Sequence, residues 1–179
     1  MKNFTLFLYS FFIYFFIFII PITFYLKFKV KVDVFHYLKL KNLPLKGWLH
    51  GLIISSIFIL FLIVKNMLLG WRPINLNLGI LWINGLMVGI LEEIPFRGFL
   101  LQKLSTHMKF WTANLLTTII FILLHIPIWT YSNVNLLQSI KSTIIFSLVL
   151  GYLFNEYDSL WVPIICHSVF NLCIWIGLS

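Results

Sequence analysis

The chain has 179 residues, of which 61% are hydrophobic, 18% aromatic and only 10% charged. An ordinary soluble domain carries about 25% charged residues, so this composition excludes a soluble globular fold. The formal net charge is +8, and the basic residues stand in short links between apolar runs. We therefore expect them to face anionic lipid and to set the orientation in the bilayer, and we expect no nucleic-acid partner.

The apolar runs indicate membrane-spanning helices. In lipid every backbone polar group must be paired within the protein, so only helices and closed β-barrels can cross. Barrel strands alternate apolar and polar residues over about ten positions, whereas the runs here are longer and apolar on all sides. The sequence thus predicts an all-α, polytopic membrane helix bundle that forms a single domain, 1–179, in the cell membrane.

Six spans are predicted in chain order. The first is too long for the apolar core of a secretory signal peptide, and no small-residue cleavage site follows it. Only the first link, 27–46, is long. It is rich in lysine and is expected to be a solvated cytoplasmic loop, although the alternation of polar and apolar residues from Lys27 to Val34 also suits a short strand or extended piece in the headgroups. The spans are 4–26, 48–69, 78–101, 111–128, 139–154 and 161–178.

Two of the three glutamates of the chain, Glu92 and Glu93, are adjacent in the third span. A charged group at the bilayer centre costs about 2.5–3.5 kcal/mol on insertion scales, so such residues are usually paired and functional. Arg97 follows Glu93 at the favourable i, i+4 spacing, and Glu92 points about 100° away. We expect Arg97 to pair with Glu93 while Glu92 faces another element. The alternative is an ion network that only fixes helix packing.

The same span contains residues that shape its backbone. Gly85 and Gly89 form a small-xxx-small pattern, which lets a neighbouring helix approach closely; packing inside the chain is the expected use. Pro95 removes one backbone hydrogen bond and frees the carbonyl of Leu91, so a kink is expected beside the acidic pair.

The last span carries both cysteines, Cys166 and Cys173. Seven residues of helix separate them by about 10 Å, which is too far for a disulfide. We expect two small packing residues.

Two histidines in separate spans complete a candidate catalytic set. His125 lies in the fourth span, and His167 lies in the sixth with Asn171 one turn further on. A glutamate can act as general base on water, a neutral imidazole can relay the proton, and a His–Asn pair suits an oxyanion. Two histidines and a glutamate could also hold zinc, but there is no HExxH motif and Asn is a poor ligand.

The polar motifs resemble those of the CAAX-protease and bacteriocin-processing family of intramembrane proteases, also called the Abi family. Glu92 to Gly98 is similar to the family's EExxxRG motif, Phe121 to His125 to FxxxH, and His167 to Asn171 to HxxxN. The resemblance covers about 79–177, the expected catalytic core.

The resemblance implies an endopeptidase that acts inside the membrane on a peptide or protein. By motif position, Glu92 would activate the water and His125 would assist. His167 and Asn171 would stabilise the oxyanion, while Glu93 and Arg97 would hold the architecture. Members of the family are described both as metalloproteases and as metal-independent; we expect no bound metal here, with one divalent ion such as zinc as the alternative. The chain is shorter than the eukaryotic members, which argues against a prenyl-cysteine substrate.

The leading functional hypothesis is an intramembrane peptidase that serves bacteriocin self-immunity or peptide maturation. A second hypothesis is a non-catalytic immunity protein that shields the membrane receptor of a bacteriocin. A third is a proton-linked transporter, since glutamate, histidine and arginine in spans also build proton relays. The absence of an inverted repeat speaks against the transporter.

Overall fold

The computed structural model describes residues 8, 11–71 and 73–178. The start of the first predicted span, 4–7, lies outside the described residues. Throughout the described part every regular element is a helix and no strand occurs. The prediction of an all-α membrane bundle is therefore confirmed.

The helices follow the order of the predicted spans, and η marks segments with π-helical hydrogen bonding. They are η1 (Phe15–Ile19), α2 (Ile20–Phe24), η2 (Tyr25–Val30), α3 (Val34–Tyr37), α4 (Pro44–Leu68), α5 (Leu81–Glu93), η3 (Ile94–Leu101), α6 (Gln102–Ser105), α7 (Phe110–Tyr131), α8 (Leu136–Tyr157) and α9 (Trp161–Trp175). The fifth predicted span, 139–154, is longer in the structure, because α8 has 22 residues.

Four helical stretches within the described residues are long and apolar enough to cross a bilayer. They are Phe11–Val30, Pro44–Leu68, Phe110–Tyr131 and Leu136–Tyr157. The other two predicted spans correspond to α5 with its continuation η3, which carries the buried charges, and to the shorter apolar helix α9. A bundle of about six membrane helices follows.

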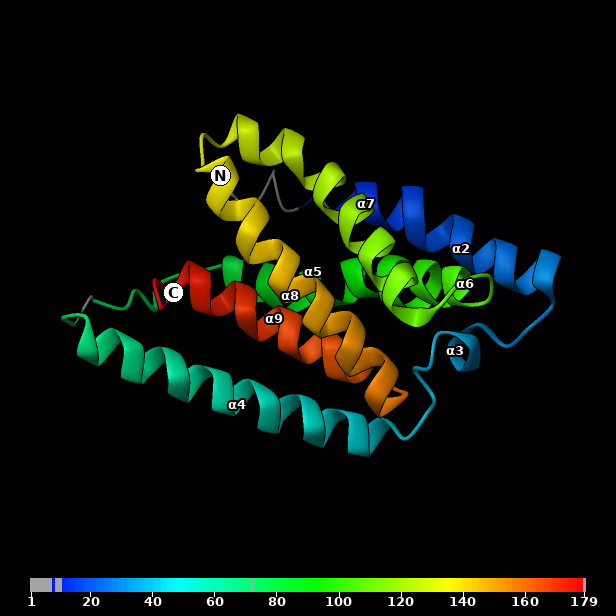
Figure 1. Cartoon of the computed structure of the whole chain (residues 1–179), viewed down its shortest axis with the longest axis horizontal. Helices are drawn as coiled ribbons and strands as arrows, with labels where there is room; N and C mark the ends of the chain where they lie inside the picture. Colours follow the sequence, from blue (N-terminus) through cyan, green and yellow to red (C-terminus); the bar gives the residue numbers. More distant parts are fainter. Residues whose placement is uncertain (1–7, 9–10, 72, 179) are drawn as a thin grey trace.

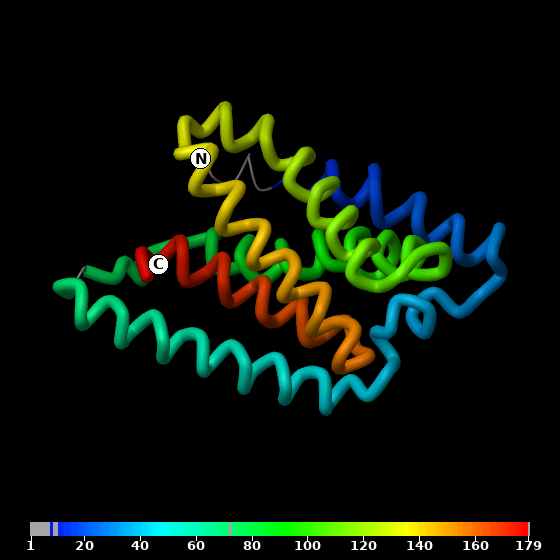
Figure 2. The backbone as a smooth tube through the Cα atoms, in the orientation of Figure 1, coloured from blue at the N-terminus to red at the C-terminus, as the bar shows by residue number. Residues whose placement is uncertain are grey.

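Helix α9 connects two parts of the bundle. It packs against α4 and α5, and it also contacts α8, which packs against α7 (Figures 1 and 2). Helix α7 further contacts η3, and η1 reaches η3 from the first helical stretch. The third, fourth and sixth predicted spans therefore meet around α5 and η3.

The close approach of α5 and α9 depends on two buried glycines, Gly85 and Gly89. A Cβ added at Gly89 would collide with the carbonyl of Ile164 and the hydroxyl of Ser168 on α9, and one at Gly85 would collide with Leu172. The prediction that these glycines serve packing within the chain is confirmed. Their contacts fix the position of α9 beside the acidic pair.

The helix changes type directly after the acidic pair. Pro95 cannot donate a hydrogen bond to the carbonyl of Leu91, and π-helical bonding runs from Ile94 to Leu101. The irregularity expected beside the acidic pair thus takes the form of a π-helical segment. This segment carries the buried Arg97.

The first link does not contain the strand suggested for Lys27 to Val34. Helix η2 continues to Val30, and α3 begins at Val34 with Asp33 as its N-cap. The apolar residues of this segment serve helix docking instead, since Leu26 is completely buried. The Lys41 ammonium and the His36 amide lower the pKa of the Asp33 carboxyl.

The end of the first link is attached to the turn between α8 and α9 rather than being free in solvent. The Lys39 ammonium lies 2.5 Å from an oxygen of Asp158. The indole of Trp161 donates a 2.9 Å hydrogen bond to the carbonyl of Leu40. The link therefore helps to hold the start of α9.

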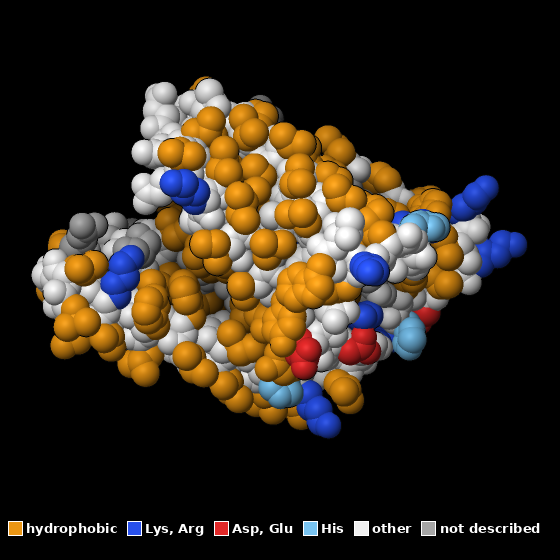
Figure 3. All heavy atoms as spheres, in the orientation of Figure 1, with side chains coloured by type: hydrophobic (Ala, Val, Ile, Leu, Met, Phe, Trp, Pro, Cys, Tyr) orange, Lys and Arg blue, Asp and Glu red, His pale blue; other side chains and the backbone are white. Residues whose placement is uncertain are grey.

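The surface suits a lipid environment. Large apolar side chains are exposed along the long helices, among them Phe61 at 62% and Leu123 at 57%. In Figure 3 apolar side chains cover most of the face shown, and charged side chains gather at the end where α3 lies. Cys166 and Cys173 are free and buried, as predicted.

Candidate active site

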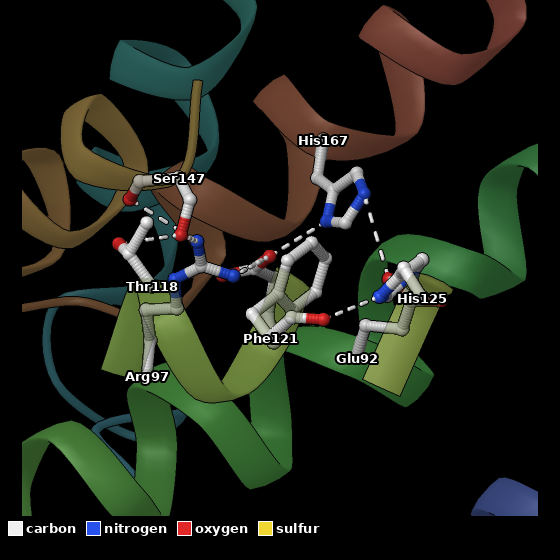
Figure 4. Close-up of polar contacts among 8 residues, drawn as sticks. Glu92, Arg97, Thr118, Phe121, His125, Ser147 and His167 are labelled. Atoms are coloured by element: carbon white, nitrogen blue, oxygen red, sulfur yellow. Dashed lines mark hydrogen bonds and ion pairs between the residues drawn. The ribbon is translucent and has the colours of Figure 1, made fainter. Parts of the chain in front are cut away.

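Glu92 forms the centre of a polar cluster inside the bundle. It lies on α5, is 7% exposed, and faces α7 and α9. Its Oε2 atom lies 3.6 Å from Nε2 of His125 and 3.8 Å from Nε2 of His167 (Figure 4). These short distances confirm the prediction that the three side chains converge. One small molecule between them can contact all three.

His125 is oriented by its own helix. Its Nδ1 atom lies 2.7 Å from the carbonyl oxygen of Phe121, one turn earlier on α7. A carbonyl can only accept, so Nδ1 carries the ring proton. In the neutral ring Nε2 is then the basic atom, and it points at Glu92. The spacing of Phe121 and His125 thus selects the tautomer as well as the position.

His167 is oriented by the second glutamate. Its Nδ1 atom lies 2.6 Å from Oε1 of Glu93. Arg97 donates to the same oxygen at 2.8 Å. A carboxylate paired with a guanidinium is ionised and only accepts, so Nδ1 of His167 donates to it. The Nε2 atom of His167 therefore also faces Glu92 as a basic atom when the ring is neutral.

Arg97 binds three elements together. Beyond its ion pair with Glu93, its Nη2 atom donates to the carbonyl and the hydroxyl of Ser147 on α8, at 3.1 and 2.8 Å. The Ser147 hydroxyl is also 2.8 Å from that of Thr118 on α7. The guanidinium lies 5.2 Å from the centre of the Phe121 ring. The predicted pairing of Arg97 with Glu93 is confirmed.

The two glutamates have separate partners. Glu93 is completely buried, and its Oε1 atom accepts hydrogen bonds from Arg97 and from His167. Oε2 of Glu92 instead faces two imidazole nitrogens that are acceptors in their neutral form. Such a group of bases favours a shared proton or a molecule with two O–H donors between them. This is the arrangement that removing a proton from water requires.

Asn171 takes a different place from the other predicted residues. It is half-buried on α9, four residues after His167 and so on the same side of the helix. Within the part of the chain that the structure describes, Asn171 makes no hydrogen bond to the cluster. Its predicted role at the oxyanion stays a prediction.

The part of the chain that the structure describes contains no recognisable metal site. Over residues 8, 11–71 and 73–178, no group of three or more His, Cys, Asp and Glu side chains has an arrangement that could hold a metal ion. The expectation that no metal is needed stays a prediction, which chelation tests.

The sequence did not indicate the groups that support Arg97 from outside its own helix. Ser147 and Thr118 are completely buried, yet small hydroxyl residues are common in apolar helices, where their hydroxyls often bond the helix's own carbonyls. Ser147 and Thr118 belong to no spaced sequence motif that would single them out. The only available clue was that a buried guanidinium has five N–H donors and one carboxylate cannot satisfy them all.

Helices that can span a bilayer around a buried acid–imidazole cluster define a membrane protein with a candidate hydrolytic centre. The model of the family described as type II CAAX prenyl endopeptidase Rce1-like matches residues 73–173. This match covers more than half of the chain and includes Glu92, His125 and His167. The chain therefore belongs to the Rce1-like family of CAAX-type membrane proteases. No curated protein and no solved structure matches it.

Proposed function

We propose that the chain is an intramembrane endopeptidase in which Glu92 is the general base. The observation that carries the proposal is the approach of Nε2 of His125 and Nε2 of His167 to one carboxylate oxygen, at 3.6 and 3.8 Å. Buried carboxylates are costly in a membrane, and Oε2 of this one faces two imidazole nitrogens rather than the charged donors that a structural ion pair would use. Family membership supports the same chemistry.

In the proposed reaction Glu92 removes a proton from a water molecule as its oxygen attacks the carbonyl carbon of the scissile amide. The C–O bond forms, the carbonyl π electrons move to oxygen, and a tetrahedral oxyanion results. Glu92, assisted by His125, then gives the proton to the amide nitrogen, and the C–N bond breaks. The products are one carboxyl group and one amine, with no covalent enzyme intermediate.

The proposed oxyanion donors are His167 and Asn171. Because Nδ1 of His167 donates to Glu93, its Nε2 atom can donate to an oxyanion only when the ring is doubly protonated. Glu93 stabilises such an imidazolium, as a carboxylate behind a catalytic histidine does. Asn171 would add its amide N–H from the next turn of α9. Arg97 holds the Glu93 carboxylate in place for this purpose through their ion pair.

The proposed substrates are peptides or proteins that are held at the cell membrane by an apolar segment, since the cluster lies among membrane helices. Bacteriocin self-immunity or the maturation of a membrane-associated peptide is the proposed biological setting. Cleavage of a bacteriocin or of its leader would serve either purpose with one active site.

The direct test expresses the chain in a bacterial host and compares newly formed peptide termini in its membranes by mass spectrometry. The three arms are wild type, Glu92→Gln and Glu156→Gln. Glu156 is exposed at the end of α8, so its substitution is the matched control. We expect new termini with wild type and Glu156→Gln that are missing with Glu92→Gln. Identical termini in all three arms would contradict the proposal.

A bacteriocin sensitivity assay separates catalysis from receptor shielding. Cells express wild type or Glu92→Gln at matched membrane levels. Immunity that depends on proteolysis is lost in the variant. Full protection by Glu92→Gln would instead favour a non-catalytic immunity protein.

A further inference from the structure

The first helical stretch brings one more polar group to Glu92. Tyr14 lies directly before η1 and is half-buried. Its side chain lies near enough to the Glu92 carboxylate for the two groups to interact electrostatically. Tyr14 lies outside the family match, which begins at residue 73.

A series of aromatic ring contacts holds the Tyr14 ring on the side of its helix that faces η3. The ring centre of Tyr14 is 5.6 Å from that of Phe18, one turn later. Phe18 lies 6.4 Å from Phe96, and Phe96 packs edge-on against Phe121 at 4.8 Å. Glu92 and Phe96 are also four residues apart. Phe18 of η1 thus meets Phe96 of η3, and Tyr14 and Glu92 each lie one helical turn before these two phenylalanines.

The other neighbours of Glu92 cannot replace this donor. His125 and His167 each use the proton on Nδ1 for another acceptor, so in their neutral forms they offer Glu92 only lone pairs. Arg97 contributes charge at a distance, but its Nη1 and Nη2 atoms donate to Glu93 and Ser147. A buried phenol, in turn, needs a hydrogen-bond partner.

We propose that Tyr14 is a positioning residue of the active site, which donates a hydrogen bond to Glu92 and so orients its carboxylate toward the attacking water. This inference rests on the proposed function for its catalytic meaning. The contact itself can be tested without catalysis. It also gives the first membrane helix a part in the active site, beyond anchoring the chain.

The first test measures how readily Glu92 reacts with dicyclohexylcarbodiimide, which modifies protonated carboxyl groups in apolar surroundings. Modification at Glu92 is mapped by mass spectrometry as a function of pH, for protein in lipid nanodiscs. Without the donor, Glu92 protonates at higher pH. We expect the labelling curve of Tyr14→Phe to shift upward by about one pH unit, the size expected for one hydrogen bond to a charged group.

Tyr25→Phe is the control, because Tyr25 belongs to the same helical stretch and also loses only a hydroxyl. Its labelling curve should match that of wild type. Difluorotyrosine at position 14 is a stronger donor and should shift the curve to lower pH, which keeps the test available if Tyr14→Phe folds poorly. Equal curves for all forms at position 14 would overturn the inference.

The second test uses cleavage. If wild type cleaves a membrane peptide, Tyr14→Phe should lower kcat by about tenfold at neutral pH, leave KM unchanged and move the acidic limb of the pH–rate profile upward. An unchanged profile in an active Tyr14→Phe protein would contradict the role of Tyr14 alone. Absence of cleavage by wild type would contradict the proposed function, while the labelling experiment would still decide the contact.

Discussion

Two neighbouring glutamates have different partners because adjacent helical residues point about 100° apart. Glu93 faces Arg97 and the Nδ1 atom of His167, and Glu92 faces the Nε2 atoms of both histidines. One carboxylate therefore accepts from two donors, and one oxygen of the other faces the ring nitrogens of two histidines. This difference underlies the proposed roles of a structural acid and a catalytic base.

At the scale of residues we predict that Arg97→Ala destabilises the protein. The substitution leaves a completely buried Glu93 without its guanidinium, and breaking a buried pair in this way costs about 3–5 kcal/mol. For a chain of this size that corresponds to a Tm lower by roughly 10 °C. Thermal unfolding in detergent and the yield of folded protein measure the effect.

The double variant Arg97→Met with Glu93→Gln is the informative comparison. It removes both charges, so it should recover part of the stability lost in Arg97→Ala while staying inactive. Arg97→Ala with wild-type yield and Tm would show that the pair does not support the fold.

Much of the cluster could be predicted because its spacing follows the helical period. Glu93 and Arg97 stand at i, i+4, and the histidines are costly groups in otherwise apolar spans. The bond from His167 to Glu93 was not expected, because the side that a histidine presents depends on the rotation of α9 about its axis. Tyr14 could not be singled out either: in a chain with 18% aromatic residues, one more tyrosine carries no information.

At the scale of elements, α9 carries His167 and Asn171 and must lie close to α5. Gly89 permits this, since a Cβ there would meet the backbone carbonyl of Ile164, which cannot move aside without its helix. The position of the candidate oxyanion donors therefore depends on a glycine that has no chemistry of its own.

We predict that Gly89→Ala displaces α9, destabilises the protein by about 1–3 kcal/mol and lowers activity more than tenfold. Ile83→Ala, at an exposed position on the same helix, is the control and should have little effect. Measurements of activity and Tm on both variants test this prediction. An active, stable Gly89→Ala protein would mean that the contact between α5 and α9 tolerates separation.

The segment from Lys27 to Val34 shows how an alternating sequence pattern can be misread. Alternation from Lys27 to Val34 suggested a strand, but the segment is helical to Val30 and turns at Lys31, which has a φ of 60°. Long lysine side chains can lie along a helix and extend their ammonium groups to the headgroup region, so polar residues at every second position do not exclude a helix in this zone. Four of the spans were predictable because length and hydropathy alone define them.

At the scale of the whole molecule, the chain encloses a polar centre within a mostly apolar bundle. Residues 73–173 match the family, whereas Tyr14 approaches Glu92 from outside that region. The limits 79–177 of a catalytic core stay a prediction. If Tyr14 acts as proposed, the functional unit also includes the first helical stretch.

We predict that activity does not depend on a bound metal. Protein in nanodiscs is treated with EDTA and with 1,10-phenanthroline, dialysed and assayed, and its metal content is measured by mass spectrometry. Cleavage should continue at the untreated rate with less than one metal ion per chain. Loss of cleavage that is restored by added zinc would instead assign Glu92, His125 and His167 to a metal site.

The most direct measurement of the central claim is the cleavage rate of a quenched fluorescent peptide, with the sequence of a wild-type-dependent cleavage site, by protein in nanodiscs. Glu92→Gln keeps the shape of the side chain and removes the base. We expect kcat/KM to fall at least a hundredfold, with normal folding, and to stay unchanged in Glu156→Gln. Cleavage by well-folded Glu92→Gln within tenfold of the wild-type rate would contradict the assignment of Glu92 as the general base.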